Sequence, residues 1–142
     1  DELKKRMEEA FKAMENFTTE KERETRDMGM EELSRQFDDM KQQSREMKQQ
    51  SEKLNEADPE MARQMEKMMS KMQEMQDQMQ RAENAKQNAQ NSQSSEELKN
   101  ISNRMQEIEN QMGKKANSLT QQMQQMQEQQ QAAMQSPEAP AV

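Results

Sequence analysis

The sequence contains no cysteine, histidine, tyrosine or tryptophan. Without cysteine the chain has no disulfide framework, no thiolate metal site and no cysteine nucleophile. Enzymes that use acid–base or nucleophilic chemistry hold such groups in a dry pocket, and the commonest of them are missing here. The Asp and Glu residues lie mainly on helical faces that solvent should cover. The sequence therefore predicts a protein that is not an enzyme, with no cofactor.

Residues that break helices or build strands are also scarce. The chain has two glycines and three prolines, and only 2% of its residues are aromatic. So few breakers permit very long helices, and the shortage of β-branched and aromatic residues argues against strands. The predicted fold class is all-α, with long amphipathic helices that form an antiparallel helical hairpin or bundle, or a coiled coil.

Hydrophobic residues make up 29% of the 142 residues, and 18 of the residues are methionine. Globular chains usually contain about 45–50% apolar residues, in a count that also includes glycine. A chain with so few cannot build a thick core around itself. Its apolar residues instead form narrow stripes, and each stripe needs a facing stripe from another helix or another molecule.

The formal net charge of −7 narrows the possible partners. Nucleic-acid binding requires a basic surface, often with aromatic side chains, so it is not expected. No apolar run approaches the roughly 18 residues of a membrane span. Helices that lie on membranes usually have basic polar faces, so membrane-surface binding is not expected either. The start at Asp1 and the lack of cysteine favour a periplasmic or secreted protein after signal-peptide removal, although an excised fragment would begin the same way.

The most informative pattern is a run of methionines spaced alternately four and three residues apart. This is the a/d spacing of a coiled coil, and it places the thioethers on one stripe of a helix. The members of this methionine seam are Met61, Met65, Met68, Met72, Met75 and Met79. Just before it, Asp58 suits an N-cap and Pro59 suits the first helical position, so a helix is predicted from Pro59 to about residue 89.

Two further stripes precede the methionine helix. Gly29 suits a left-handed helix cap, and the register shifts by two after it, so either a short turn or a local stutter is predicted between them. Residues 18–27 are polar along the seam, and a capping box at Thr19 and Glu22 leaves open whether 2–27 is one helix or two. The first stripe consists of Leu3, Met7, Ala10, Met14 and Phe17, widened by Phe11. The second consists of Met30, Leu33, Phe37, Met40, Ser44, Met47, Ser51 and Leu54.

The C-terminal region predicts one more helix. Residues 87–95 are rich in Asn, Gln and Ser and are predicted as a loop, after which Ser94 and Glu97 can form a capping box. The seam consists of Leu98, Ile101, Met105, Ile108, Met112 and Leu119. Met123 and Met126 follow after a slip of one residue, and Gly113 is a candidate bend. The chain thus divides into acidic N-terminal helices (1–57), a Met-rich helix (58–90), a Gln/Met-rich helix (91–135) and a flexible tail (136–142).

Three functions remain open on this pattern. The first is a structural, scaffolding coiled coil that self-assembles or docks into a larger complex through its stripes. The second is a helical chaperone or export adaptor that binds apolar client segments on Met-rich surfaces. The third is a Cu(I) or Ag(I) protein, since thioethers are soft ligands, with Met65, Met68, Met69 and Met72 as the densest group. A coiled-coil seam demands the same spacing, so spacing alone does not separate packing from metal binding.

Overall fold

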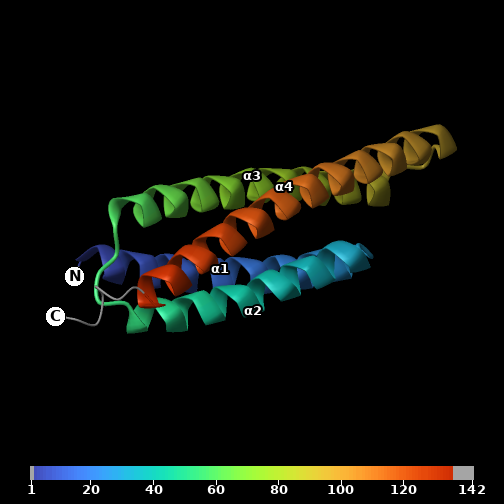
Figure 1. Ribbon diagram of the computed structural model, residues 1–142. Coiled ribbons are helices and arrows are strands. Elements are labelled where there is room, and N and C mark those ends of the chain that lie inside the picture. The colour runs from blue at the N-terminus through green and yellow to red at the C-terminus, as the bar shows by residue number, and fades with distance from the viewer. Residues whose placement is uncertain (1, 136–142) are drawn as a thin grey trace.

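The computed structural model describes residues 2–135, which form a bundle of four long helices without a strand (Figure 1). The helices are α1 (Glu2–Asp27), α2 (Glu31–Lys53), α3 (Pro59–Asn91) and α4 (Ser95–Gln135). This confirms the predicted all-α helical bundle. The predicted tail, 136–142, lies outside the described residues.

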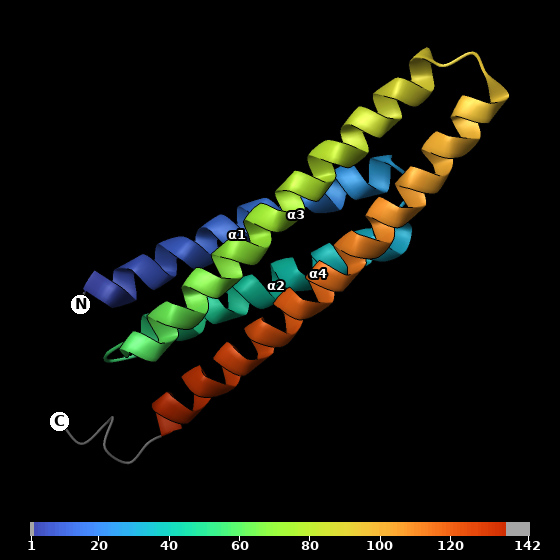
Figure 2. The same ribbon diagram turned by 90° about the horizontal axis from the view of Figure 1, so that it is seen from above.

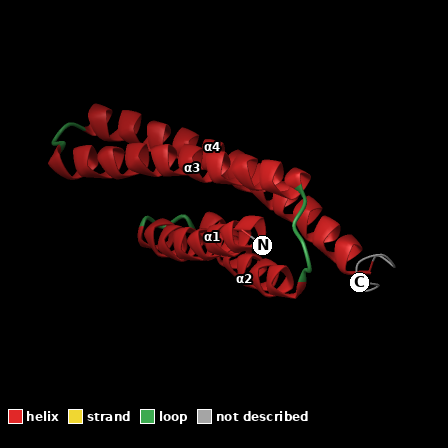
Figure 3. Cartoon of the chain, turned by 90° about the vertical axis from the view of Figure 1, so that its left-hand side faces the viewer, coloured by secondary structure: helices red, strands yellow, loops and turns green. Residues whose placement is uncertain are grey.

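The helices pair as two antiparallel hairpins, α1 with α2 and α3 with α4, which lie one against the other (Figures 2 and 3). Between the hairpins, α1 packs on α3 and α2 packs on α4, and each of these pairs runs in the same direction. Around the bundle the order is therefore α1, α2, α4, α3. The second hairpin is the longer one, and its far end projects beyond the turn of the first (Figure 1).

The first hairpin turns at Gly29, so the change of register there is a turn between two helices and not a stutter within one. Gly29 has a φ of 79°, in the left-handed region that glycine adopts without strain. The amide of Gly29 donates to the carbonyl of Arg26 at 3.0 Å, and the amide of Met30 donates to that of Thr25 at 2.9 Å. These bonds close the last turn of α1 as a Schellman motif, and the buried Met30 adds the apolar contact typical of it.

Residues 2–27 form one continuous helix rather than two. Thr19 makes no capping box, since its hydroxyl donates to the carbonyl of Glu15 at 2.8 Å, one turn earlier in the same helix. The threonines in the polar part of the seam can be buried because their hydroxyls hydrogen-bond within the helix. The hydroxyl of Thr18 donates to the carbonyl of Met14 at 2.8 Å, and that of Thr25 donates to the carbonyl of Lys21 at 2.7 Å. The buried line of α1 keeps 4-3 spacing through Met7, Phe11, Met14, Thr18, Lys21 and Thr25.

The second hairpin begins at Asp58, whose carboxylate accepts from the amide of Met61 at 2.9 Å, with Pro59 at the first helical position. Its turn is shorter than predicted, because α3 continues to Asn91 and only residues 92–94 connect it to α4. Asn and Gln tolerate helix, so composition alone overestimates the loop.

A shift of seam register lies within α4, which passes Gly113 without interruption. After Met112 the next buried residue is Ala116 and not Lys115. Two steps of four, from Ile108 to Met112 and from Met112 to Ala116, therefore follow each other. From Ala116 the spacing runs regularly through Leu119, Met123 and Met126. The shift therefore falls before Leu119, earlier than the predicted slip, and it is absorbed as a stutter in a continuous helix.

Replacing each of the two glycines by alanine should change the free energy of unfolding in opposite directions. Gly29→Ala should lower the free energy of unfolding by about 1 kcal/mol, because an L residue is strained at positive φ. Gly113→Ala should raise it by roughly 0.5–1 kcal/mol, because alanine favours a helix interior and its methyl meets nothing within 4 Å. Urea unfolding measures both, and effects of the same sign would contradict the assignment of cap and helix interior.

Candidate functional site

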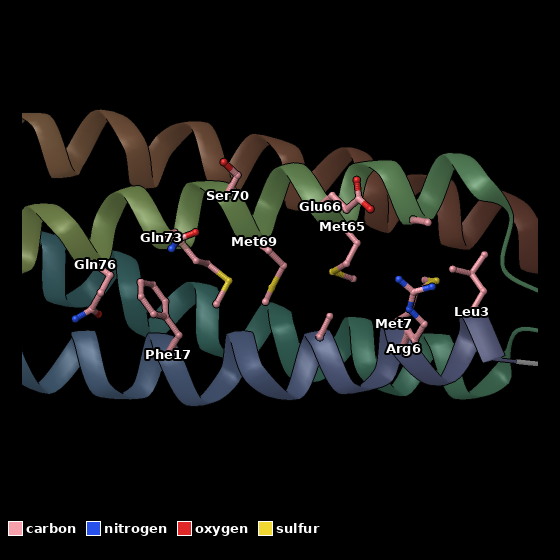
Figure 4. Close-up of a pocket in the computed structure, with 13 residues that line it drawn as sticks. Leu3, Arg6, Met7, Phe17, Met65, Glu66, Met69, Ser70, Gln73 and Gln76 are labelled. Carbon is pink, nitrogen blue, oxygen red and sulfur yellow. The ribbon is translucent and has the colours of Figure 1, made fainter.

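A groove with a volume of about 660 Å³ runs along the side of the bundle where α1 faces α3 (Figure 4). Its walls are mainly apolar, and polar side chains from α3 stand along one edge. From α1 it is lined by Leu3, Arg6, Met7, Ala10 and Phe17. From α3 it is lined by Ala62, Met65, Glu66, Met69, Ser70, Met72, Gln73 and Gln76. The groove is concave and mainly apolar, with a few polar groups at its edge, so it is the candidate site.

Small side chains explain why the helices leave space at this position. Ala10 on α1 and Ala62 and Ser70 on α3 line the groove without filling it. The bulkiest buried residue of the same part of α1, Phe11, is fully buried elsewhere in the core and does not line the groove. The α1/α3 contact is therefore made by short side chains and by the flanks of longer ones, and it stays partly open.

The methionines of α3 divide into a buried set and a groove-facing set. Met68 is 0% exposed and does not line the groove, whereas Met69 lines it and is 38% exposed. Met65 and Met72 belong to both sets, since they are in the core and keep 7% exposure at the groove. Figure 4 shows the side chains of Met65 and Met69 reaching from α3 into the space in front of α1.

The opposite side of the bundle is held by hydrogen bonds between α2 and α4. Gln43 Nε2 donates to Gln127 Oε1 at 3.1 Å, and the fully buried Gln130 donates to the carbonyl of Met47 at 3.3 Å. Gln36 also donates to Asn117. These bonds fix the two hairpins together along α2 and α4. The groove therefore lies along the side of the bundle opposite to this hydrogen-bonded contact.

Phe17 closes one end of the groove and is held by residues of both helices in the first hairpin. Its ring lies edge-to-face with that of Phe37, at 6.3 Å between centroids. The ammonium group of the buried Lys21 lies 5.5 Å from the centre of the Phe17 ring and 3.0 Å from a carboxylate oxygen of Glu24. Lys21 is thus compensated by a carboxylate and an aromatic face although it stands in the seam.

The environment of Glu24 shifts the proton affinity of its carboxyl group. Burial raises the pKa of the Glu24 carboxyl, because the charged form loses hydration. The hydrogen bond and charge of Lys21 act in the opposite direction and lower this pKa, while Glu20 and Glu83 add to the increase. Burial has the larger effect, so the net direction is upward.

Most of the predicted seam residues lie in one core. The stripe from Met30 to Leu54 and all six members of the methionine seam are buried, as are Ile108, Met112 and Leu119. In α1, Met7 and Met14 are buried while Leu3 and Phe17 are partly buried and line the groove. In α4, Ile101 and Met105 are partly buried, and Leu98 is 42% exposed because it lies on the projecting end of the hairpin.

The sequence predicts some of the residues that line the groove, but not the groove itself. Leu3, Met7, Ala10 and Phe17 belong to the predicted first stripe, and Met65 and Met72 belong to the methionine seam. Ala62, Ser70, Gln73 and Gln76 lie off the 4-3 stripes, where helical spacing predicts the surface. Met69 directly follows Met68, and the seam does not require it. Which helix faces it depends on how the hairpins pair, and helical spacing does not specify that.

Within residues 2–135, no group of three or more His, Cys, Asp or Glu side chains could hold a metal ion. None of the helices in this part of the chain is long and apolar enough to cross a membrane. Comparison with known proteins gives no match: no family model, curated protein or solved structure matches the chain.

Replacing Lys21 by methionine should raise the pKa of Glu24 further, because the substitution removes the cation that opposes the effect of burial. A raised carboxyl pKa means that the folded protein binds this proton more tightly than the unfolded chain does. The associated stability is present below the ordinary Glu pKa and is lost as pH rises through the folded-state pKa. Stability of the variant should therefore fall more steeply across this window than that of the unchanged protein.

Carbon NMR of the Glu24 carboxyl gives the pKa, and urea unfolding at a series of pH values gives the slope. A Glu24 pKa that is unchanged or lower in the Lys21→Met protein would contradict this account of the Lys21–Glu24 pair.

Proposed function

We propose that this protein is a non-enzymatic helical chaperone or adaptor, which binds an amphipathic helical segment of a partner protein in the groove between α1 and α3. One observation carries the proposal: a methionine-lined groove is open to solvent in a bundle whose main seams already pair with one another. Since most of the seam residues are covered within the chain, the groove is an apolar surface that remains open to a partner.

The size of the groove suits one face of a helix. From Leu3 to Phe17, and from Ala62 to Gln76, the walls extend about 21 Å at a rise of about 1.5 Å per residue. A helix of about 14 residues has this length and can present anchors at positions i, i+3 or i+4, and i+7. The volume of about 660 Å³ accommodates several large apolar side chains, while the helix backbone remains above the rim.

The charge of the protein indicates the polar face of the partner. The chain carries a net charge of −7, so a partner helix with a basic polar face is attracted and oriented. Of the groove residues only Arg6 and Glu66 carry charge, one of each sign, and Gln73 and Gln76 provide neutral amides. The apolar face of the helix would therefore enter the groove, and its basic face would remain in solvent.

Methionine walls suit a binding site that accepts more than one sequence. The thioether side chain is unbranched and polarizable, so it repacks around side chains of different shape. Met69 is 38% exposed and lies outside the 4-3 seam, so it can change rotamer without disturbing the buried seam residues. This adaptability is typical of chaperones and adaptors that bind many related segments.

Replacing Met69 by glutamate should weaken binding of a basic amphipathic helical peptide about tenfold, because it removes one apolar contact worth about 1.5 kcal/mol and places a charge in the groove. The protein has no tryptophan or tyrosine, so a single tryptophan on the apolar face of the peptide reports its burial by a blue shift without background. Titration of the peptide with protein gives the affinity.

The matched control is Met134→Glu. Met134 is 37% exposed, almost the same as Met69, but it lies near the end of α4 and does not line the groove. The two variants therefore change charge and apolar surface equally at different places. Equal loss of peptide affinity in both, or none in either, would overturn the proposed binding site.

A second candidate function, the self-assembling scaffold, is supported by the projecting end of the α3/α4 hairpin. There Leu98 is 42% exposed, and Ile101 and Met105 are only partly buried, although all three continue the seam of α4. A second copy could cover this end of the hairpin. In that case assembly would use the hairpin end and not the methionine seam, which is already buried.

Light scattering over a concentration series separates the two candidates. The chaperone or adaptor function predicts a monomer at all concentrations, because the seams pair within one chain. A scaffold that uses the hairpin end predicts a dimer or larger species that Leu98→Glu dissociates, because the added charge cannot be buried at an apolar contact.

A further inference from the structure

We infer that the groove also holds a soft monovalent cation, Cu(I) or Ag(I), through the thioether sulfurs of Met65, Met69 and Met72. Thioethers are uncharged, polarizable ligands that favour Cu(I)-type ions over Mg²⁺ or Ca²⁺. The inference concerns the same wall of α3 as the proposed peptide site, but it rests on ligand chemistry and does not require a protein partner.

The first observation is that core packing does not explain Met69. The 4-3 seam of α3 is complete without it, and all six seam methionines are at most 7% exposed. Met69 lies outside that spacing and is 38% exposed, yet it lines the groove. A charged or polar residue would be the usual choice at such a position on an otherwise Gln- and Glu-rich helix face.

The second observation is that the seam methionines differ in their access to solvent. Met65 and Met72 each retain 7% exposure, whereas Met61, Met68, Met75 and Met79 are at 0–1%. The two that remain accessible are the two that share the groove with Met69. The sequence groups Met65, Met68, Met69 and Met72 as possible metal ligands. Of these four, Met68 does not line the groove.

The spacing of these three methionines allows one ion to contact all of them. Met69 follows Met65 by four residues and precedes Met72 by three, so the three lie on one face over two turns. Residues at these separations have Cβ atoms about 5–6 Å apart. The flexible methionine side chain covers that distance easily, so three sulfurs can converge on a small ion. Figure 4 shows Met65 and Met69 directed to the same side of α3.

The surroundings of the three sulfurs favour a soft cation. Ala10 and Phe17 on the opposite wall are apolar and provide no harder competing ligand. Glu66 brings one negative charge to the groove wall, and Arg6, near Leu3 at the far end, brings one positive charge (Figure 4). Thioethers do not titrate, so the ion binds without releasing a proton.

Silver(I) is the appropriate probe, because it has the ligand preference of Cu(I) and needs no reductant. The intact chain, labelled with ¹³C in the methionine methyl groups, is titrated with Ag(I) and followed by NMR, with resonances assigned by single Met→Leu substitutions. We expect saturation at one equivalent, with the large shifts confined to Met65, Met69 and Met72. Met69→Leu should weaken Ag(I) binding about tenfold or more, as loss of a ligand does.

Met134→Leu is the control, since it removes an equally exposed thioether outside the groove and should leave the affinity unchanged. Shifts spread over Met134 and the groove methionines alike, or unchanged affinity in Met69→Leu, would overturn the site. Met69→Leu keeps the groove apolar, so peptide binding should survive and the two proposals fail independently.

Discussion

The structure depends on the pairing of narrow apolar stripes within one chain. With 29% hydrophobic residues, no helix here can be covered on more than one face, so each stripe must meet another. The turn at Gly29 and the cap at Asp58 achieve this by folding the chain into two hairpins that lie together. Thr18 and Thr25 extend the buried line of α1 because their hydroxyls bond to the preceding turn, and Lys21 does so because Glu24 and Phe17 accompany its charge.

The two contacts between the hairpins differ in kind, and this difference creates the groove. On the α2/α4 side, glutamines bridge the helices, with Gln43 bonded to Gln127 and Gln130 bonded to the backbone of α2. On the α1/α3 side, Ala10, Ala62 and Ser70 leave space instead. The small residues would cost packing contacts in a closed bundle. Concentrated along one side, they leave an open apolar channel, while the hydrogen bonds on the opposite side of the bundle hold the two hairpins together.

Helical spacing was sufficient to predict the stripes of α2 and α3, because each stripe is a property of one helix. The stripe positions from Met30 to Leu54 and the whole methionine seam are buried as their periodicity requires, and the carboxylate of Asp58 caps α3 as expected. The ends of the first and last stripes are less buried, as at Leu3 and Leu98. The polar half of α1 and the length of α3 were less predictable, since local hydroxyl bonds and tolerant Asn and Gln residues decide them. Several groove residues belong to predicted stripes, but the groove that they form between α1 and α3 was not predictable. It depends on which helices face each other, and the spacing within α1 or α3 contains no information about its neighbour.

Methionine connects the packing of this bundle with the functions proposed for it. Leucine would fill the same seam, and it would satisfy the same 4-3 spacing, but it would provide neither an adaptable wall nor a sulfur ligand. Where methionine is fully buried, as at Met68, only its packing matters. At Met65, Met69 and Met72 the side chains are accessible from the groove, so the same residue type can also contact a ligand. An occupant that bridges α1 and α3 would supply contacts that the two helices do not make with each other. Binding there would thus stabilise the folded bundle, since the unfolded chain offers no such site.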